Sequence, residues 1–196
     1  MKPKLLCYAS TPKQIHAFIN AGASDIIIED ARLSVRSMQH PWPPTSQLRD
    51  IISKAKQTFP NKQLWINIEK IAHPHDIKSL TTLITRLKKD QVNAFRIQDL
   101  GVLSLFKSIH PKAKLWYAPE FGYSSIEAIK HMSPHCHVHH ISNDCPITNI
   151  KKYRKTSSQP LSIQIFGPIL IQYSQRRYIS YLENTQEALI STITDT

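Results

Sequence analysis

The sequence has little glycine and little cysteine. Its 4 glycines stand at positions 22, 101, 122 and 167, and YASTPKQ follows the first apolar run where a Gly-rich phosphate loop would stand. This counts against a dinucleotide-binding sheet. The 3 cysteines, at positions 7, 136 and 145, form no CxxC pair. A disulfide framework and a four-cysteine metal site are therefore not expected.

Long apolar runs are also missing. No stretch approaches the ~20 apolar residues that a membrane-spanning helix needs. The basic start, MKPKLLCYASTPKQIHAF, contains only about five apolar residues in a row, fewer than a secretory signal peptide requires. We therefore expect a cytoplasmic protein without a membrane partner.

The remaining composition is that of a globular protein with excess positive charge. Hydrophobic residues make up 41% and charged residues 20% of the 196 residues, which suits one domain. The 25 Lys and Arg residues outnumber the 14 Asp and Glu residues, which gives a formal net charge of +11. Such a charge favours phosphate-bearing or acidic partners, RNA among them, although lysines spread along a chain also serve solubility.

Short apolar runs alternate with helical patterns along the chain. The runs that predict strands are residues 4–9, 25–29, 63–68, 94–98, 114–118, 137–141 and 161–166. The clearest helices are predicted over 11–22, with Thr11 as N-cap and Gly22 as stop, and over 73–90.

This alternation argues for parallel strands joined by helical crossovers. An α/β fold is expected, as a (β/α) TIM-like barrel that is incomplete or compressed, with about seven strands. An open doubly wound sheet is the second possibility. The barrel-like domain is predicted over 1–182, followed by a tail or short helix over 183–196. Gly101, Gly122 and Gly167 follow predicted strands, where a glycine can let the backbone approach a ligand.

Polar side chains follow the carboxyl ends of the predicted strands, where barrels bind ligands. They are Glu29, Asp30, Asn67, Glu69, Gln98, Asp99, Glu120, Asn143 and Asp144, then Tyr173, Ser174 and Arg176 beyond Gly167, with Arg36 at loop distance after the second strand. Such a set can position a polar, partly anionic substrate and supply acid or base groups. Taken singly, each is better explained by solvation or, for Asp99 and Asp144, by helix capping than by catalysis.

Two segments resemble motifs of the collagenase-like peptidases, the thirty-second family of peptidases of unassigned mechanism. NAFRIQDLGVLSLFK (93–107) resembles the family's strand, Gln-Asp-Leu-Gly and helix. SIQIFGPILIQYSQRRYIS (162–180) resembles its signature of an apolar strand, a glycine, and a Tyr-Ser pair followed two residues on by arginine. PKQIHAFINAGASDIIIE (12–29) and the Ser-x-Arg of Ser34 and Arg36 support the likeness, which runs from residue 4 to residue 182.

The resemblance implies a (β/α) barrel and a set of site residues. The residues carried over are Gln98, Asp99, Gly101, Gly167, Tyr173, Ser174 and Arg176, with Arg36 as a further match. Asp144 stands where relatives usually have glutamate after a Ser-Arg pair, and Asn143 replaces that arginine. Several members carry an iron–sulfur cluster and take part in hydroxylation of RNA bases or ubiquinone precursors, and others are recorded as proteases.

The cluster ligands of the family are absent here. The family's cysteines stand three residues after the glycine and one after the arginine, where this chain has Leu170 and Arg177. Because a cluster needs thiolate ligands and the three cysteines stand elsewhere, we expect no iron–sulfur cluster.

Two hypotheses follow. In the first, a cluster-free member of the peptidase family binds an anionic or peptide-like ligand at the barrel mouth, with Arg176 as the carboxylate or phosphate clamp and Tyr173 and Ser174 as positioning hydroxyls. Hydrolase activity rests on resemblance alone, because neither a recognisable triad nor an HExxH motif is present. In the second, the chain is a pseudoenzyme that partners a cluster-bearing homologue in RNA or ubiquinone-precursor hydroxylation.

The histidine-rich stretch HMSPHCHVHH (131–140) allows two interpretations. On a strand, His135, His137 and His139 would share one face and could bind zinc or nickel. Neighbours on one strand face are ~7 Å apart, however, too far for a compact tetrahedral site without other ligands. The same pattern suits a half-buried strand with a polar side, and no metal site is assigned.

Overall fold

The described part of the chain folds into an incomplete (β/α) barrel of seven parallel strands. A computed structural model describes residues 3–29, 33, 45–120 and 122–167. Its elements are β1 (Leu6–Tyr8), α1 (Pro12–Asn20), β2 (Asp25–Glu29), α2 (Thr45–Thr58), β3 (Leu64–Ile68), the short 3-10 helix η1 (Pro74–Asp76), α3 (Ile77–Lys89), β4 (Ala94–Ile97), α4 (Leu100–Ile109), β5 (Lys114–Tyr117), α5 (Ile126–Met132), β6 (Val138–His140), α6 (Ile147–Thr156) and β7 (Leu161–Ser162).

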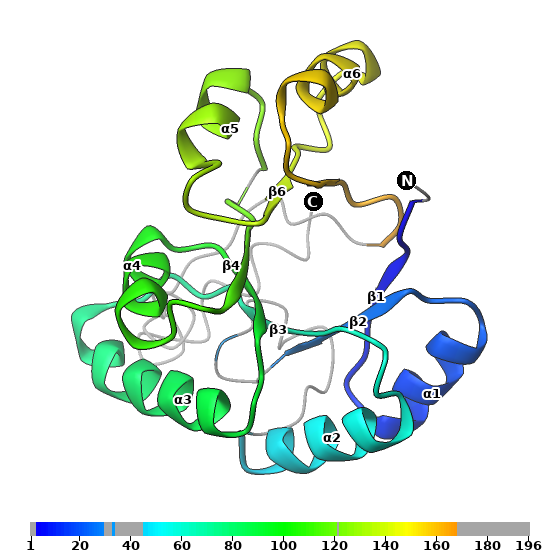
Figure 1. Cartoon of the computed structure of the whole chain (residues 1–196), viewed down its shortest axis with the longest axis vertical. Coiled ribbons are helices and arrows are strands. Elements are labelled where there is room, and N and C mark those ends of the chain that lie inside the picture. Colours follow the sequence, from blue (N-terminus) through cyan, green and yellow to red (C-terminus); the bar gives the residue numbers. More distant parts are fainter. Residues whose placement is uncertain (1–2, 30–32, 34–44, 121, 168–196) are drawn as a thin grey trace, which may run out of the picture.

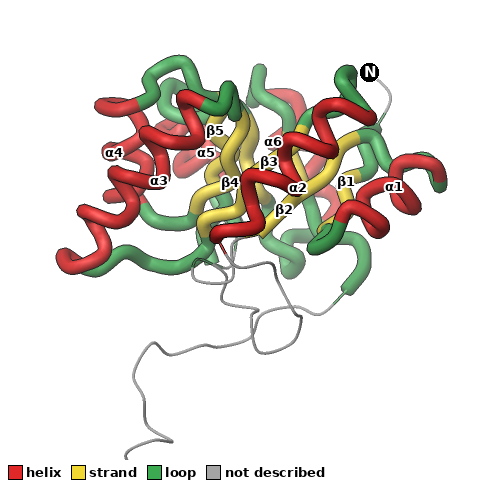
Figure 2. Tube along the Cα trace, turned by 90° about the horizontal axis from the view of Figure 1, so that it is seen from below, coloured by secondary structure: helices red, strands yellow, loops and turns green. Residues whose placement is uncertain are grey.

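The strands lie in the sheet in chain order, from β1 to β7, and every neighbouring pair is parallel. A doubly wound sheet would reverse its strand order at a switch point, so the barrel prediction is confirmed and the open sheet is excluded. The sheet curls with the helices on its outer side (Figure 1), and Figure 2 shows strands enclosed between helices.

Alternation of side chains explains why both faces of the sheet are buried. In β2, Ile26 and Ile28 pack toward the helices in the outer core, whereas Ile27 belongs to a separate inner cluster. The inner cluster consists of Ile27, Trp65, Ala94, Trp116 and Ala118. Parallel strands covered on both sides read as near-continuous apolar runs, which is why DIIIE and LWINI were recognisable as strands.

The helices begin and end where the sequence predicts. Thr11 Oγ1 accepts a hydrogen bond from the Gln14 backbone N–H at 3.2 Å, and Pro12 is the first helical residue of α1. Gly22 follows this helix with φ +106°. The apolar face of α3 is buried through Leu80, Leu83, Ile84 and Leu87.

Several predictions fall on residues outside the described ranges. They are the tail over 183–196 and the residues Asp30, Arg36, Tyr173, Ser174 and Arg176. The first and last predicted strands are shorter than expected, with three residues in β1 and two in β7. Within the described ranges, no helix has the length and apolar character needed to cross a membrane.

Gly122 permits a close approach between two backbone segments rather than the predicted approach to a ligand. Its φ is +72°, and a Cβ built there would lie 2.4 Å from the Ser142 backbone nitrogen. The neighbouring Tyr123 N–H donates to the His140 carbonyl at 2.7 Å, and the Ser142 N–H donates to the Tyr123 carbonyl at 3.0 Å. The glycine therefore lets the segment after β5 pair with the end of β6. Gly101 lies instead in the first turn of α4.

We expect Gly122→Ala to lower the free energy of unfolding by about 2–4 kcal/mol, because the methyl group adds a backbone clash to an unfavourable φ. Gly22→Ala is the matched control, since its φ is also positive but nothing lies within 4 Å of the added Cβ; it should cost about 1–2 kcal/mol. Urea unfolding followed by circular dichroism measures both. Equal losses would contradict the close approach at Gly122.

Candidate ligand-binding site at the carboxyl ends of the strands

Four polar side chains from three adjacent strands form a buried network on the inner face of the sheet. Glu29, Asn67, Glu69 and Arg96 are 0%, 0%, 2% and 5% exposed. Asn67 Nδ2 donates to Glu29 Oε1. Arg96 Nη1 donates to Asn67 Oδ1 at 2.9 Å and to Glu69 Oε1 at 3.0 Å. The strand register, which pairs Glu29 with Asn67 and Asn67 with Arg96, brings these groups into reach.

The guanidinium of Arg96 is held from two sides. Its ion pair with Glu69 spans 3.0 Å between side chains that are 7% and 3% exposed. Its Cζ lies 5.4 Å from the ring centroid of Trp116, a cation–π contact. Trp116 in turn meets Trp65 edge-on at 5.5 Å. Because an uncompensated buried charge costs several kcal/mol, these partners fix the position of Arg96.

Hydrogen-bond donors remain available beside this network. The two Nη1 hydrogens of Arg96 are both used, whereas its Nε and Nη2 donate to no acceptor in the part of the chain that the structure describes. Gln98 lies one inward position further along the chain and is 7% exposed. Its buried Nε2 also lacks an acceptor among the described residues. A guanidinium fork and a free amide are donors suited to a carboxylate, a phosphate or a peptide carbonyl.

A histidine and a serine lie on the same inner face, next to Trp116. The ring centroids of His140 and Trp116 are 6.2 Å apart. His140 pairs with Ser162 in the register of β6 and β7. Its Nδ1 lies 2.9 Å from Ser162 Oγ, and both side chains are half-buried.

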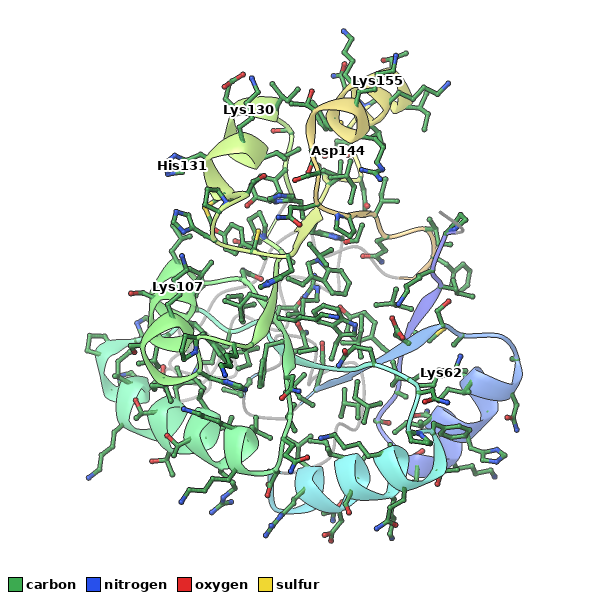
Figure 3. The ribbon with its side chains drawn as sticks, viewed as in Figure 1. Lys62, Lys107, Lys130, His131, Asp144 and Lys155 are labelled. Atoms are coloured by element: carbon green, nitrogen blue, oxygen red, sulfur yellow. The ribbon has the colours of Figure 1, made fainter. Side chains whose placement is uncertain are left out.

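The other residues predicted for the site are placed differently. Asp99 is the N-cap of α4, and its Oδ1 accepts a hydrogen bond from the Val102 N–H at 2.8 Å, as the capping interpretation predicts. Asp144 is exposed in the connection between β6 and α6 (Figure 3), with its backbone N–H donating to Ser142 Oγ at 3.3 Å. Gly167 is exposed, with φ +105°.

The structure brings Glu29, Asn67 and Glu69 together and places Gln98 next to Glu69 in the strand register. Among the described residues, neither Asp99 nor Asp144 is hydrogen-bonded to this network. Asp99 and Asp144 do follow the carboxyl ends of parallel strands, at one rim of the barrel. Arg36, Tyr173, Ser174 and Arg176 lie outside the described residues, so their role stays a prediction.

Sequence reasoning missed Arg96. The signal was present in NAFRIQ, where an arginine interrupts an apolar strand and shares the inward parity of Gln98. A charge at such a position is buried if the strand is, and so requires a partner.

The histidine row has structural contacts. His137 Nδ1 accepts a hydrogen bond from the Leu115 N–H at 3.1 Å. His139 is fully buried on the outer face, where its Nε2 lies 3.1 Å from Ser133 Oγ and its Nδ1 lies 3.5 Å from Cys136 Sγ. Burial lowers the pKa of His139 and raises the pKa of Cys136 to about 11. Within the described ranges, no three His, Cys, Asp or Glu residues are grouped so that they could hold a metal ion.

A curled wall of parallel strands with buried polar side chains at their carboxyl ends is the arrangement by which (β/α) barrels bind ligands and perform catalysis. The model of peptidase family U32 matches residues 10–190. The chain therefore belongs to this family, as its motifs predict.

Solved structures support the fold. The chain matches the U32 peptidase Mk0906 with a TM-score of 0.66 and 13% identity, over 83% of this chain and 68% of that one. It matches a glycerophosphodiester phosphodiesterase from Parabacteroides distasonis with a TM-score of 0.59 and 10% identity, over 84% of this chain and 85% of that one. It matches 2,3-dimethylmalate lyase with a TM-score of 0.58 and 8% identity, over 98% of this chain and 83% of that one. These likenesses establish the fold alone, and no curated protein matches the sequence.

We expect Arg96→Met to lower the free energy of unfolding by about 3–5 kcal/mol, because Glu69 loses its guanidinium partner in a buried setting. Arg86→Met is the matched control, since Arg86 is exposed on α3; it should change stability by no more than about 0.5 kcal/mol. Chemical denaturation measures both variants. A difference below about 1 kcal/mol between them would contradict a structural role for the ion pair.

Proposed function

We propose that this U32-family protein binds an anionic or peptide-like ligand at the carboxyl-end mouth of its incomplete barrel, without an iron–sulfur cluster. The observation that carries the proposal is a set of donors on Arg96 and Gln98 that meet no acceptor among the described residues, beside a buried hydrogen-bonded network. A buried donor without an acceptor costs about 1–3 kcal/mol, and a ligand oxygen that accepts from it recovers that cost.

Each group has a distinct role in this proposal. Arg96 Nε and Nη2 donate to a carboxylate or phosphate oxygen, and Gln98 Nε2 donates to a second oxygen, such as a peptide carbonyl. Glu29, Asn67 and Glu69 hold the guanidinium in position rather than contact the ligand. Arg36 and Arg176 would add positive charge at the rim, and Tyr173 and Ser174 would add hydroxyls, as the family motifs imply.

The cysteine positions support the cluster-free part of the proposal. Cys7, Cys136 and Cys145 all pack in or against the outer core between the strands and the helices. The thiols of Cys7 and Cys136 lie on the helix side of the sheet, and Cys145 follows β6 in the connection to α6. None of the three stands where the family motif has a cysteine, which supports the absence of a cluster.

The Gln98→Met variant tests this function. We expect it to weaken binding of N-acetyl-dialanine about tenfold or more, as measured by calorimetry, because the hydrogen bond from the Gln98 amide to the peptide is lost. Its melting temperature should stay equal or rise, because an unsatisfied buried donor is removed. Gln47→Met, an exposed change on α2, is the control and should bind like the parent. Equal binding by both variants, or no saturable binding of this peptide or of small di- and tricarboxylates to the parent, would contradict the proposal.

The alternative role, a non-catalytic partner in RNA or ubiquinone-precursor hydroxylation, is favoured by the charge of one end of the molecule. Helix α6 exposes Lys151, Lys152, Arg154 and Lys155. Lys130 of α5 and Lys155 project outward at this end (Figure 3). A cationic surface of this kind attracts phosphate backbones.

Retention on single-stranded RNA at increasing salt measures this second role. Each phosphate contact contributes a slope of roughly −0.7 in log K against log salt concentration. The double variant Lys151→Gln with Lys155→Gln should therefore flatten the slope, whereas Lys78→Gln with Lys89→Gln, on the exposed side of α3, should not. No retention at low salt, or equal slopes for the two variants, would remove RNA as the partner of α6.

A further inference from the structure

The register of the strands places five positions in one row at the mouth. Ile68, Ile97, Tyr117 and His139 pair across successive strands, and His140 pairs with Ser162. The residue that follows each of the first four therefore lies in one row with Ser162. From β3 to β7 this row consists of Glu69, Gln98, Ala118, His140 and Ser162. By the alternation of side chains along a strand, all five positions lie on the inner face of the sheet, as Trp116 and Val138 do. The row therefore brings the amide of Gln98 and the pair of His140 and Ser162 to the same level of the inner wall.

Ala118 separates the two polar parts of this row. Its side chain is a single methyl group that packs in the inner cluster with Trp116. Ala118 is the one position of the row between Gln98 and His140, and it is 1% exposed. Gln98 and His140 therefore lie two strands apart at the same level of the inner wall.

We propose that Ser162 is a nucleophile and His140 its general base in an acyl-transfer reaction at the mouth. The Ser162 Oγ to His140 Nδ1 distance of 2.9 Å is within the reach that proton transfer requires. With Nδ1 unprotonated, the Ser162 hydroxyl donates to it. The inference rests on the proposed function, because the mouth must hold the acyl group.

The chemistry is a hydrolysis in two steps. Ser162 Oγ forms a bond to the carbonyl carbon of an ester or amide while its proton passes to His140 Nδ1. The bond from carbon to the leaving alcohol or amine breaks, and the leaving group takes that proton. Water, with His140 again as base, then cleaves the acyl-serine to a carboxylic acid and restores the hydroxyl.

A second serine–histidine pair in the same protein provides an internal comparison. Ser133 Oγ lies 3.1 Å from His139 Nε2 and also donates to the Ile129 carbonyl at 2.8 Å. His139 is 0% exposed and lies on the outer face of the sheet. This pair is closed to a substrate, whereas His140 and Ser162 are both half-exposed on the inner wall.

A fluorophosphonate probe tests the assignment. Attack by Ser162 Oγ forms an oxygen–phosphorus bond and releases fluoride, so the adduct is permanent and its position can be read by peptide mass mapping. We expect labelling of the full chain at Ser162, loss of the label in Ser162→Ala, and unchanged labelling in Ser133→Ala. His140→Gln should slow labelling roughly 100-fold or more, because the glutamine amide accepts a hydrogen bond but is no base.

The labelling result tests Ser162 as the nucleophile separately from the binding result, which tests the ligand class. If N-acetyl-dialanine binds and Ser162 remains unlabelled, the nucleophile is refuted and the binding function stands. If Ser162 is labelled and no ligand of the panel binds, the nucleophile stands and the proposed ligand class falls. Equal labelling of parent and Ser162→Ala, or equal rates for parent and His140→Gln, overturns the inference, provided that circular dichroism shows both variants folded like the parent.

Discussion

The ion pair between Arg96 and Glu69 is the interaction on which the interior of this barrel depends. Arg96 is 5% exposed and has little access to water, so the charge of its guanidinium must be compensated largely by protein groups. Glu69 supplies the opposite charge, Asn67 an acceptor, and Trp116 the face of an indole. These three partners come from β3, its carboxyl end and β5, the two strands that flank β4, so Arg96 links three adjacent strands at the point where the polar mouth begins.

The inner wall is consequently divided into layers along the strands. The indole of Trp65 and the side chains of Ile27 and Ala94 form an apolar layer. Above it lie Arg96 and the network that holds it. An apolar layer keeps water from the underside of the polar one, and hydrogen bonds in such a setting are stronger than in water. The donors that meet no acceptor among the described residues lie in this setting, where a hydrogen bond to the proposed ligand would be strong.

The sequence predicted the strands well because each is buried on both faces and so reads as an apolar run, as in DIIIE of β2. It predicted the caps of α1 and α4 because capping is local, an effect of Thr11 on Gln14 and of Asp99 on Val102. The site was harder to predict, because it depends on which residues of different strands stand in register. His140 and Ser162 are 22 positions apart in the chain, and no local pattern links them. Asp99, by contrast, belongs to a family motif and was predicted for the site, but its described hydrogen bond is that of a helix cap.

Membership of the U32 family fixes the fold but not the chemistry of this chain. Alternate side chains along a strand face opposite sides of the sheet, and this decides what each can contact. Cys7 faces the helix side of β1 and packs against the outer core, to which Cys136 and Cys145 also belong. The Cys136 thiol lies near the Met132 carbonyl and His139 Nδ1, and burial raises its pKa to about 11. The inner side carries a guanidinium, amides, carboxylates, an imidazole and a hydroxyl instead. Groups of these types can form hydrogen bonds with oxygen atoms and transfer protons, which is the chemistry that the proposed ligand binding and acyl transfer require.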